Sequence, residues 1–431
     1  MDAKDNKRKE ELIKPELPGG FRDALPEDMI AKQKMIDTIR TVFERFGFDP
    51  METPAVEKTE VLIGGEKASG KIIFNVIVSE DEKSDTSLRF DLTVPLARVL
   101  AANPDIPKPF KRYQIGKAWR GERQQTGRYR EFLQMDVDIL GAKSLDADAE
   151  IIQVMYETLK ALGVDDFAIR LNNKNEIVEL LKKVGVADDR VERTLIEIDK
   201  EDKRTPEEWA SGVKDASGLE GESAESLLQK ISNDENPGPE VQTVRKKALA
   251  LGVPDTVLKY DASLVRGLGY YTGSTFEVVL NDLPRFGSVF SGGRYDGLTA
   301  RFSRESWLAV GSSMGVDRLF AALEELGKIK REQTLNQVLI MNLSDDYSRE
   351  YSGFARDLRN AGINTTLYLG DDKAFSAQLA YAVKKEIPFV IIYGEKEAAS
   401  GKAQIKDLRR NIQTETARAE LAGAVKELLK D

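Results

Sequence analysis

The sequence contains no cysteine and no histidine among its 431 residues. Without thiols there are no disulfides, and without thiols and imidazoles the usual ligands of structural zinc are missing. The fold must therefore depend on an ordinary hydrophobic core, for which 41% hydrophobic residues suffice. The same absences exclude Ser-His-Asp triads, cysteine nucleophiles and a metal site formed by His or Cys. Any catalysis must use arginine, lysine, carboxylates, hydroxyls, backbone amides or an oxygen-bound metal such as Mg²⁺.

The charge distribution restricts the partners. A formal net charge of -9 argues against indiscriminate binding of polyanions. Residues 111–130 are an exception, with seven basic side chains against the single acid Glu122. No apolar run approaches the roughly 18 residues of a membrane span, and the amino terminus lacks a signal-peptide apolar region. We therefore expect a cytoplasmic protein with no membrane partner and a mobile charged N-terminus over 1–17.

Hydrophobic periodicity predicts an α+β fold for the first 330 residues. Apolar spacing predicts an amphipathic helix over 26–47 and another over 144–162. A charged, helix-favouring stretch over about 172–258 predicts a helical insertion. Separated mainly by turns and charged segments, the strand-like runs suggest a six- or seven-stranded antiparallel sheet with flanking helices. These runs are 71–78, 112–120, 130–140, 167–171, 275–280 and 288–293, with a further strand leading into a helix within 308–326.

The last hundred residues show a different pattern, in which strand-like and helix-like runs alternate. This alternation over 337–431 predicts a small α/β domain with a mainly parallel sheet. A polar connector before it marks the boundary with a first domain over 18–330.

Four candidate sites have plain structural alternatives. Gly65, Gly70 and Lys71 have phosphate-loop spacing, but Ile72 follows where Ser or Thr is required, so a hairpin loop is the better interpretation. The arginine-rich segment around Arg120 suits phosphate binding or a solvated hairpin. Residues 266–273 and 291–298, rich in glycine and tyrosine, suit a ligand pocket or a curved sheet with core tyrosines. Taken alone, Arg318 would be a surface ion pair.

A resemblance connects these candidates. RYQIGKAWRGERQQTGRYREFLQMDVDILG, LVRGLGYYTGSTFE, SGGRYDGL and GSSMGVDRL resemble, in order and spacing, motif 2, the two histidine-binding signatures and motif 3 of histidyl-tRNA synthetases. The segment 87–100 is similar to the amino-acid-binding segment of that family, and Pro54 lies in its motif 1. The resemblance extends from about residue 15 to the end. It implies a class II synthetase antiparallel sheet and a C-terminal anticodon-binding domain over 337–431.

The resemblance implies histidine activation by ATP with Mg²⁺, followed by transfer to the 3′ end of histidine tRNA. The attacking carboxylate is already ionised, so the first step needs charge stabilisation at the α-phosphate and no general base. The implied catalytic residues are Arg120, Arg266 and Arg318. ATP-binding is assigned to Arg120, Glu122 and Arg318.

The resemblance also assigns the amino-acid pocket, the tRNA contacts and a dimer. Neutral imidazole has one donor and one acceptor, which suit a carboxylate and a hydroxyl. Asp138 and Tyr271 occupy the matching positions, and Tyr270 has a lesser pocket role. For the α-amino group the implied residues are Asp91 and Gln134, with Thr93 beside them. The tRNA acceptor end would meet Arg123, Gln124 and Arg128, and a homodimer would form around Pro54.

Two departures from the family pattern keep alternatives open. Gly269 stands where the family usually has Asp, and Leu133 stands where it usually has His. One alternative is a non-catalytic paralogue such as the regulatory subunit of ATP phosphoribosyltransferase, although that subunit generally lacks the C-terminal domain. The other is an RNA-binding sensor domain. The complete absence of histidine suggests the hypothesis that the sequence avoids the amino acid whose supply to translation it serves.

Overall fold

The computed structural model describes residues 13–64, 73–77, 84–122, 129–201, 204–233, 236–265, 271–304 and 307–430. The chain divides into two compact units, each described by itself. The first unit comprises Met1–Asp23 and Met35–Ile329, and the second comprises Ala24–Lys34 and Lys330–Asp431. The domain boundaries expected from sequence stay a prediction.

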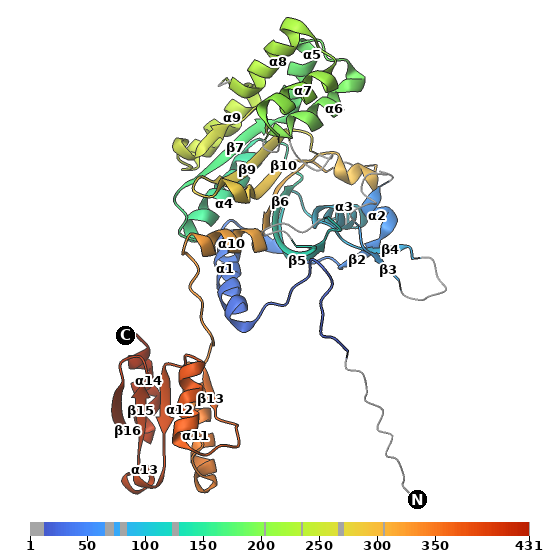
Figure 1. Cartoon of the computed structure of the whole chain (residues 1–431). Helices are drawn as coiled ribbons and strands as arrows, with labels where there is room; N and C mark the ends of the chain where they lie inside the picture. The colour runs from blue at the N-terminus through green and yellow to red at the C-terminus, as the bar shows by residue number, and fades with distance from the viewer. Residues whose placement is uncertain are drawn as a thin grey trace, which may run out of the picture. The chain divides into compact units, whose positions relative to one another are not determined.

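An eight-stranded sheet forms the centre of the first unit (Figure 1). Its six central strands are antiparallel, and a short strand pairs in parallel at each edge. In spatial order they are β1 (Asp49–Pro50), β5 (Phe110–Trp119), β6 (Glu131–Leu140), β11 (Ala309–Gly315), β10 (Ser288–Arg294), β9 (Ser274–Leu280), β7 (Phe167–Asn173) and β8 (Leu258–Tyr260). The expectation of six or seven antiparallel strands was wrong at the edges, because strands of two or three residues carry no readable alternation.

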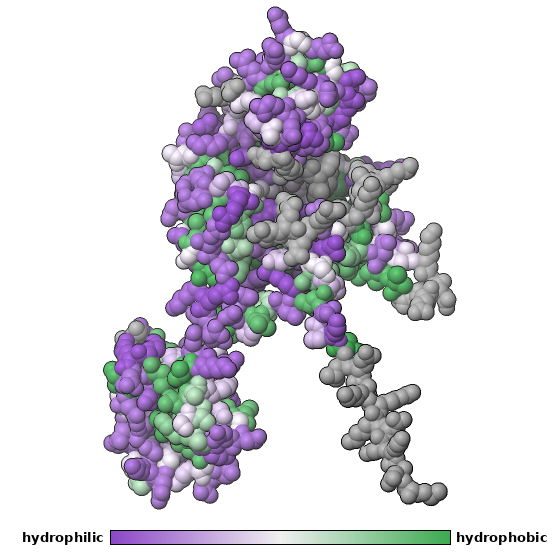
Figure 2. Space-filling model, in the orientation of Figure 1, coloured by the Kyte–Doolittle hydropathy of each residue, from purple (hydrophilic) through white to green (hydrophobic). Residues whose placement is uncertain are grey.

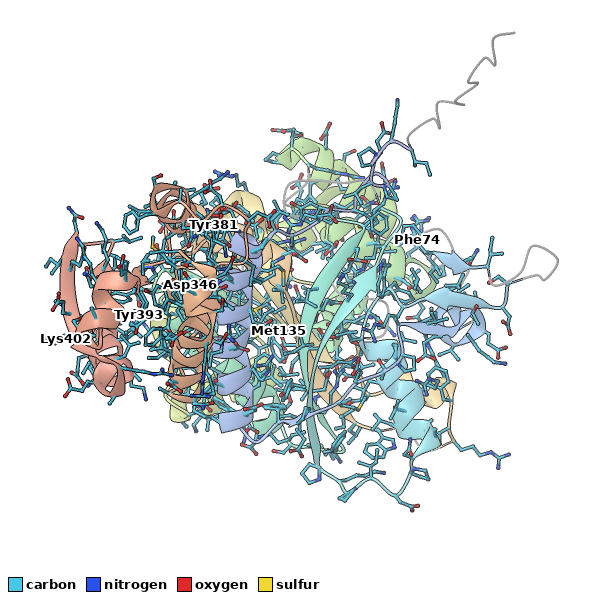
Figure 3. The ribbon with its side chains drawn as sticks, turned by 90° about the horizontal axis from the view of Figure 1, so that it is seen from below. Phe74, Met135, Asp346, Tyr381, Tyr393 and Lys402 are labelled. Atoms are coloured by element: carbon cyan, nitrogen blue, oxygen red, sulfur yellow. The ribbon has the colours of Figure 1, made fainter. Side chains whose placement is uncertain are left out.

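One face of this sheet is apolar and covered by helices. Met135 (Figure 3), Val137 and Val278 are buried on it, and the ring of Tyr113 lies 6.0 Å from that of Phe43 on α1 (Pro26–Arg45). The helices α4 (Asp146–Ala161) and α10 (Val316–Glu325) pack against the central strands. The burial of this face contributes apolar contacts that stabilise the sheet.

The opposite face is partly covered by smaller elements. A three-stranded sheet consists of β2 (Val56–Lys58), β4 (Thr86–Leu88) and β3 (Asn75–Val76). Helices α2 (Thr59–Ile63) and α3 (Thr93–Ala102) pack with Leu140, Tyr295 and Trp307 in one hydrophobic cluster. The sequence predicted a strand of the large sheet over 71–78, and this placement was wrong. In the described part of that segment only Asn75–Val76 form a strand, and it belongs to the three-stranded sheet.

The predicted helical insertion is confirmed between β7 and β8. It comprises α5 (Lys174–Lys183), α6 (Asp188–Ile198), α7 (Pro206–Ser217), α8 (Gly221–Asn233) and α9 (Pro239–Ala250). The side chain of Thr205 accepts a hydrogen bond from the Glu208 amide and caps α7, as Pro206 opens the helix. Leu181, Trp209 and Leu227 are buried in a core that belongs to the insertion. Its outer surface is largely hydrophilic (Figure 2).

The second unit contains a five-stranded mixed sheet. The strand order is β13 (Thr365–Leu367), β12 (Val338–Ile340), β14 (Phe389–Ile392), β15 (Lys402–Asp407) and β16 (Ile412–Ala417). Strand β12 is parallel to both neighbours, whereas β14, β15 and β16 are antiparallel. The accompanying helices are α11 (Ser348–Asn360), α12 (Phe375–Lys384), α13 (Glu395–Ser400) and α14 (Leu421–Lys430). The expected mainly parallel sheet was therefore wrong for its second half, where a tight turn with Asn411 at φ 55° closes a hairpin.

Within the described part of the chain, no helix combines the length and apolar character that a membrane crossing requires.

Candidate active site

Two rows of residues run across the less covered face of the large sheet. Neighbouring strands place one residue each opposite the next, so a row follows the sheet from β5 to β7. The first row is Arg112, Asp138, Gly311, Gly293, Thr275 and Asn172. The second row is Gln114, Asp136, Ser313, Ser291, Glu277 and Arg170. Since the rows are two residues apart on every strand, their side chains share one face.

Glycines in the first row leave room for their neighbours. A Cβ on Gly311 would collide with Asp138 Oδ1, and a Cβ on Gly293 would lie 2.9 Å from the Tyr271 ring. The carboxylate of Asp138 and the ring of Tyr271 therefore occupy space above the neighbouring strands β11 and β10. Burial raises the pKa of Tyr271, and the negative charge of Asp138 raises it further. The structure thus brings this predicted pair together.

Both oxygens of Asp138 meet groups of the chain. The Tyr295 hydroxyl donates to Oδ1, and Arg112 Nη2 lies 2.7 Å from Oδ2 in an ion pair. That ion pair lacks the alignment of a hydrogen bond, so Oδ2 has no hydrogen-bond partner among the described residues. Burial raises the pKa of Asp138, and the Arg112 guanidinium and the Tyr295 hydrogen bond oppose this rise. A fixed positive charge thus favours the carboxylate form.

A hydrogen-bonded chain connects the second row. Gln134 Nε2 donates to Ser313 Oγ at 2.5 Å, and that hydroxyl donates to Asp136 Oδ1 at 2.5 Å. Burial raises the pKa of Asp136 to about 7, despite the positive charge of Arg112. Near neutral pH this carboxyl group can therefore change protonation when a cation arrives beside it.

Asp91 lies at the start of α3. Its Oδ1 accepts a hydrogen bond of 3.0 Å from the Val94 amide, and Thr93 is the first residue of the helix. Burial raises its pKa, while the backbone hydrogen bonds and the charge of Arg120 oppose the rise. One carboxylate oxygen thus orders the helix terminus, and the other oxygen has a separate environment.

Several buried polar atoms in this face have no hydrogen-bond partner among the described residues. The acceptors are Asp91 Oδ2, Gln134 Oε1, Asp136 Oδ2 and Asp138 Oδ2, and the donors are Arg112 Nε and Nη1. Buried polar atoms in folded proteins are nearly always paired, so such a cluster indicates a binding site. Four acceptors around an acidic centre favour a ligand that carries several N–H donors and a positive charge.

Two predicted catalytic arginines lie at strand and helix ends and are oriented by backbone carbonyls. Arg120 follows β5, where its Nε donates to the Phe90 carbonyl at 3.0 Å. Arg318 lies in the first turn of α10, and its Nη1 donates to the Ser288 carbonyl at 2.6 Å. Glu122 is exposed near the end of β5, consistent with a place at the rim.

Arg22 joins the residues that flank 123–128 to the helix that carries Arg318. Its guanidinium lies 4.0 Å from the centroid of the Tyr129 ring and donates to the Tyr129 hydroxyl at 2.9 Å. It also donates to Asp317 Oδ1 at 2.9 Å, while Asp317 Oδ2 accepts from the Leu133 amide at 2.8 Å. Leu133, a departure from the family pattern, therefore contributes a backbone contact that any residue could make.

Several predicted site residues lie outside the described residues. They are Arg123, Gln124, Arg128, Arg266, Gly269, Tyr270, Gly65, Gly70 and Lys71.

The glycine- and tyrosine-rich segment 291–298 has two roles. Tyr295 belongs to the site through its hydrogen bond to Asp138. Arg294 instead forms a buried ion pair with Asp148 on α4 and donates to the Ala142 carbonyl at 3.2 Å. Tyr295 also packs in the hydrophobic cluster with Leu140 and Trp307, so it is a core tyrosine, as the structural alternative expects, whose hydroxyl reaches Asp138.

Arg112, Asp136 and Ser313 were not predicted as site residues, and Tyr295 was included only as part of the candidate segment 291–298. A signal existed in β6, where Gln134, Asp136 and Asp138 alternate with apolar residues. Such alternation usually indicates a strand with one face in water. The structure buries both faces, and this burial makes the polar positions informative.

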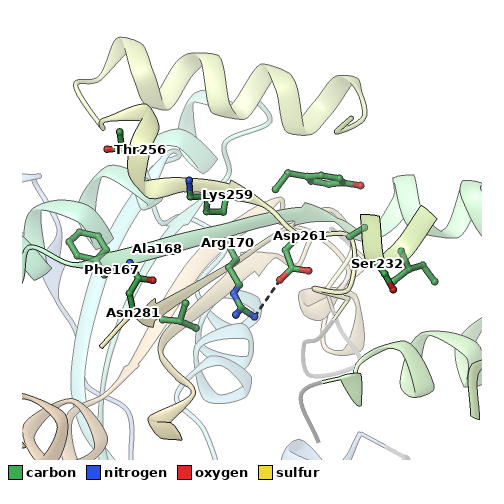
Figure 4. A pocket seen from close by; sticks show the side chains of 12 residues that line it. Phe167, Ala168, Arg170, Ser232, Thr256, Lys259, Asp261 and Asn281 are labelled. Atoms are coloured by element: carbon green, nitrogen blue, oxygen red, sulfur yellow. Dashed lines mark ion pairs between the residues drawn. The ribbon is translucent and has the colours of Figure 1, made fainter. Parts of the chain in front are cut away.

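A pocket of about 440 Å³ lies near the β7–β8 edge (Figure 4). Its lining includes Ile231 and Ser232 of α8, and an ion pair of 3.3 Å between Arg170 and Asp261 crosses it. Arg170 also ends the second polar row, so the polar face extends to this edge.

A six-stranded antiparallel core with a polar face, arginines at strand and helix ends and a mixed α/β unit defines a class II aminoacyl-tRNA synthetase. The family described as histidyl-tRNA synthetase matches residues 20–319, and the anticodon binding domain family matches residues 337–428. The chain belongs to the histidyl-tRNA synthetase family.

Relatives and solved structures agree with this assignment. The histidine–tRNA ligase of Wolinella succinogenes is 39% identical over 425 residues, covering 93% of this chain and 96% of the relative. That of Clostridium tetani is 39% identical over 428 residues, covering 94% and 96%. The crystal structure of histidyl-tRNA synthetase from Nostoc sp. PCC 7120 matches with a TM-score of 0.85 and 31% identity, covering 96% of this chain and all of that one.

One solved structure bears on the paralogue alternative. An ATP phosphoribosyltransferase regulatory subunit/histidyl-tRNA synthetase from Bacillus halodurans C has a TM-score of 0.68 at 23% identity, covering 86% of this chain and 97% of that one. At this identity the likeness is one of fold alone. The paralogue alternative has correspondingly less support than the ligase.

Proposed function

We propose that the polar face of the large sheet is the site where this histidine–tRNA ligase activates histidine with ATP, before transfer to the 3′ end of histidine tRNA. The observation that carries the proposal is a group of four buried acceptor oxygens that accept no hydrogen bond among the described residues, one of which, Asp138 Oδ2, forms an ion pair with Arg112. Histidine with a neutral imidazole offers four N–H donors, three on its ammonium group and one on the ring. The ligand's donor count thus equals the number of these acceptors.

The pocket residues divide between the two ends of histidine. Asp138 would accept the imidazole N–H, and the Tyr271 hydroxyl would donate to the other ring nitrogen. Asp91 and Gln134 would accept from the α-amino group, with Thr93 beside them and Tyr270 in a lesser pocket role. Support comes from the oxygens of Asp91 and Gln134 that accept no hydrogen bond among the described residues, and from the electrostatic contact between Asp138 and Tyr271.

Activation needs negative charge to be stabilised at the α-phosphate as the ionised carboxylate attacks. Arg120 and Arg266 would hold the α-phosphate and the carboxylate, and Arg318 would hold the γ-phosphate. Glu122 would contact the adenine end. Mg²⁺ fits this site chiefly as a companion of ATP, because the described residues form no group of three acidic side chains placed to hold a metal.

The macromolecular partners remain expectations. Arg123, Gln124 and Arg128 would contact the tRNA acceptor end, and the second unit would bind the anticodon region. A homodimer around Pro54 and a cytoplasmic location stay predictions. Pro54 is exposed, as an interface residue of an isolated chain would be.

ATP–pyrophosphate exchange with the full chain tests the proposed function. We expect exchange that depends on histidine and is absent with glutamine or asparagine, followed by charging of histidine tRNA. A chain that binds RNA without any exchange would instead support the sensor alternative. Absence of both exchange and charging would support the regulatory paralogue.

A further inference from the structure

Arg112 is a buried cation among the carboxyl groups of Asp91, Asp136 and Asp138. Its relative exposure is 0%, and it lies opposite Asp138 in the β5–β6 register. Its Nη2 is 2.7 Å from Asp138 Oδ2 and 3.5 Å from the Leu92 carbonyl. Its Nε and Nη1 have no hydrogen-bond partner among the described residues. Burying a guanidinium with unpaired N–H groups lowers the stability of the fold unless neighbouring negative charges compensate its desolvation. Its retention here therefore points to an electrostatic role.

The groups around Asp138 show what that task is. Asp136 lies two residues before Asp138 on the same strand, and Asp91 lies in the segment before α3. The side chain of Tyr271, before β9, and the hydroxyl of Tyr295, after β10, also lie near Asp138. Arg112 is the largest source of positive charge acting on both Asp136 and Asp138. Arg120 also contributes positive charge at Asp91. Without Arg112, burial would drive the two β6 carboxyls towards their protonated forms.

The protonation state of Asp138 decides which ring edge it can recognise. An ionised carboxylate only accepts hydrogen bonds and therefore requires an N–H on the imidazole. A protonated carboxyl can also donate, and it would then tolerate the bare nitrogen of the ring. The Tyr295 hydroxyl occupies Oδ1, so the cation beside Oδ2 sets the charge of the oxygen that remains for the ligand.

We propose that Arg112 determines specificity for histidine by keeping Asp138 ionised and oriented towards the imidazole N–H. Arg112 is a positioning residue, because it acts through Asp138. This inference rests on the proposed function of the pocket. The ammonium group of histidine then brings a second positive charge to Asp91, Asp136 and Asp138. Because this charge also favours the ionised form of Asp138, binding of the ammonium group and binding of the imidazole reinforce each other.

Steady-state ATP–pyrophosphate exchange on Arg112→Met and Arg112→Lys tests the proposal. For Arg112→Met we expect KM for histidine to rise on the order of 100-fold, with KM for ATP changed less than about threefold. Arg112→Lys keeps the charge but loses the planar fork, so about a tenfold rise is expected. The acid limb of the pH profile of kcat/KM for histidine should move to higher pH in Arg112→Met, since Asp138 loses its nearest cation.

Two further variants separate this role from a structural one. Asp148→Asn breaks a second buried arginine–aspartate pair of the same unit, outside the pocket, and should lower the melting temperature without changing the ratio of the two KM values. Arg112→Met combined with Asp136→Asn replaces the cation, and a carboxyl that becomes protonated without it, by neutral side chains, which should limit the loss of folding while KM for histidine stays high. The proposal fails if Arg112→Met, or the folded double variant, keeps wild-type KM and pH profile.

The outcomes also separate this proposal from the proposed function. A wild-type chain without histidine-dependent exchange would overturn the proposed function itself. A wild-type chain with exchange, together with unchanged KM for histidine in the Arg112 variants, would overturn the role of Arg112 alone.

Discussion

The two large sheets of this chain differ in the polarity of the residues on their faces. In the sheet of the second unit, Val338 and Ile340 pack on one side with α11 and α14, while Leu339 and Met341 pack on the other. On the first side, the ring centroid of Tyr393 lies 5.1 Å from that of Phe354. On the other side, the ring centroid of Tyr381 lies 5.5 Å from that of Tyr368. Tyr393 and Tyr381 are labelled in Figure 3. In the sheet of the first unit, one face is apolar and the other carries two polar rows. In the second unit both faces of the sheet are buried by apolar packing, whereas in the first unit one face packs and the other carries the polar residues of the proposed site.

This difference has an energetic reason. Each buried carboxyl or guanidinium costs desolvation energy that an aliphatic side chain does not, and the ligand recovers part of that cost when it binds. We therefore expect substitutions in the polar rows to change activity strongly, and to lower stability only where they leave one partner of a buried ion pair uncompensated. Substitutions in the second unit should show the reverse. Four predictions, from the largest effect to the smallest, test this comparison.

Arg120→Ala should have the largest effect on activity. Loss of a charge-assisted contact to the developing phosphate charge is expected to lower kcat by about three orders of magnitude in ATP–pyrophosphate exchange. Arg120→Lys should retain part of the activity, because the charge remains while the fork is lost. Thermal unfolding should change little for both. A large drop in melting temperature with normal kcat would contradict the assignment of this residue to the polar face.

Phe354→Ala should have the largest effect on stability. Phe354 is 1% exposed in the core of the second unit, so truncation is expected to cost about 3–5 kcal/mol in the free energy of unfolding of that unit. Urea unfolding followed by limited proteolysis would measure it. Phe375→Ala, at a position that is 41% exposed, is the matched control and should cost less than about 1 kcal/mol. Both variants should retain histidine-dependent exchange. Loss of exchange would show that packing in the second unit is also required for histidine activation.

Asp136→Asn should change the pH dependence of stability. The folded-state pKa of about 7 lies above the ordinary value of 3.8, so the folded state holds a proton that the unfolded state releases between these values. The wild-type chain should therefore lose stability as pH rises from about 4 to about 7, by on the order of 2–4 kcal/mol from this group. The variant should lack that loss. Melting temperatures at pH 5 and pH 8, without ligand, provide the comparison, and a parallel pH response of both proteins would refute the prediction.

Arg22→Ala should have the smallest effect of the four. Loss of the contacts to Tyr129 and Asp317 is expected to raise KM for ATP about fivefold to tenfold, because residues near Arg120 and Arg318 lose a common tether. Arg22→Lys should recover part of the effect. Arg40→Ala, which removes a local ion pair with Asp37 on α1, is the control and should leave KM unchanged. Equal effects of the two alanine variants would argue against the tether.

Much of the fold could be predicted because its main elements carry local signals. The strands β5, β6, β9 and β10 and the insertion helices follow alternation, periodicity and composition that involve near neighbours only. The edge strands β1 and β8 were missed, since their two or three residues become strands only by pairing with a long neighbour. The hairpin of β15 and β16 was misjudged because strand direction depends on how the chain returns to the sheet.

The site was predicted unevenly for a related reason. Asp138, Tyr271, Asp91 and Gln134 followed from motif resemblance, and the described structure places them around one group of buried polar atoms. Arg112 is absent from that assignment although it lies 2.7 Å from Asp138. The two residues are 26 positions apart in the sequence, and only the β5–β6 register sets them opposite each other.

The amino-acid sequence by itself determined the alternation of polar and apolar side chains in β6, the exclusion of imidazole and thiol chemistry, and the supply of arginines near motif 2. Tertiary structure alone decided that Asp136 and Asp138 are buried and that Arg112, on the neighbouring strand, pairs with Asp138. The physical reason is that alternation assigns a side chain to a face, whereas its charge state and its partners depend on whatever covers that face.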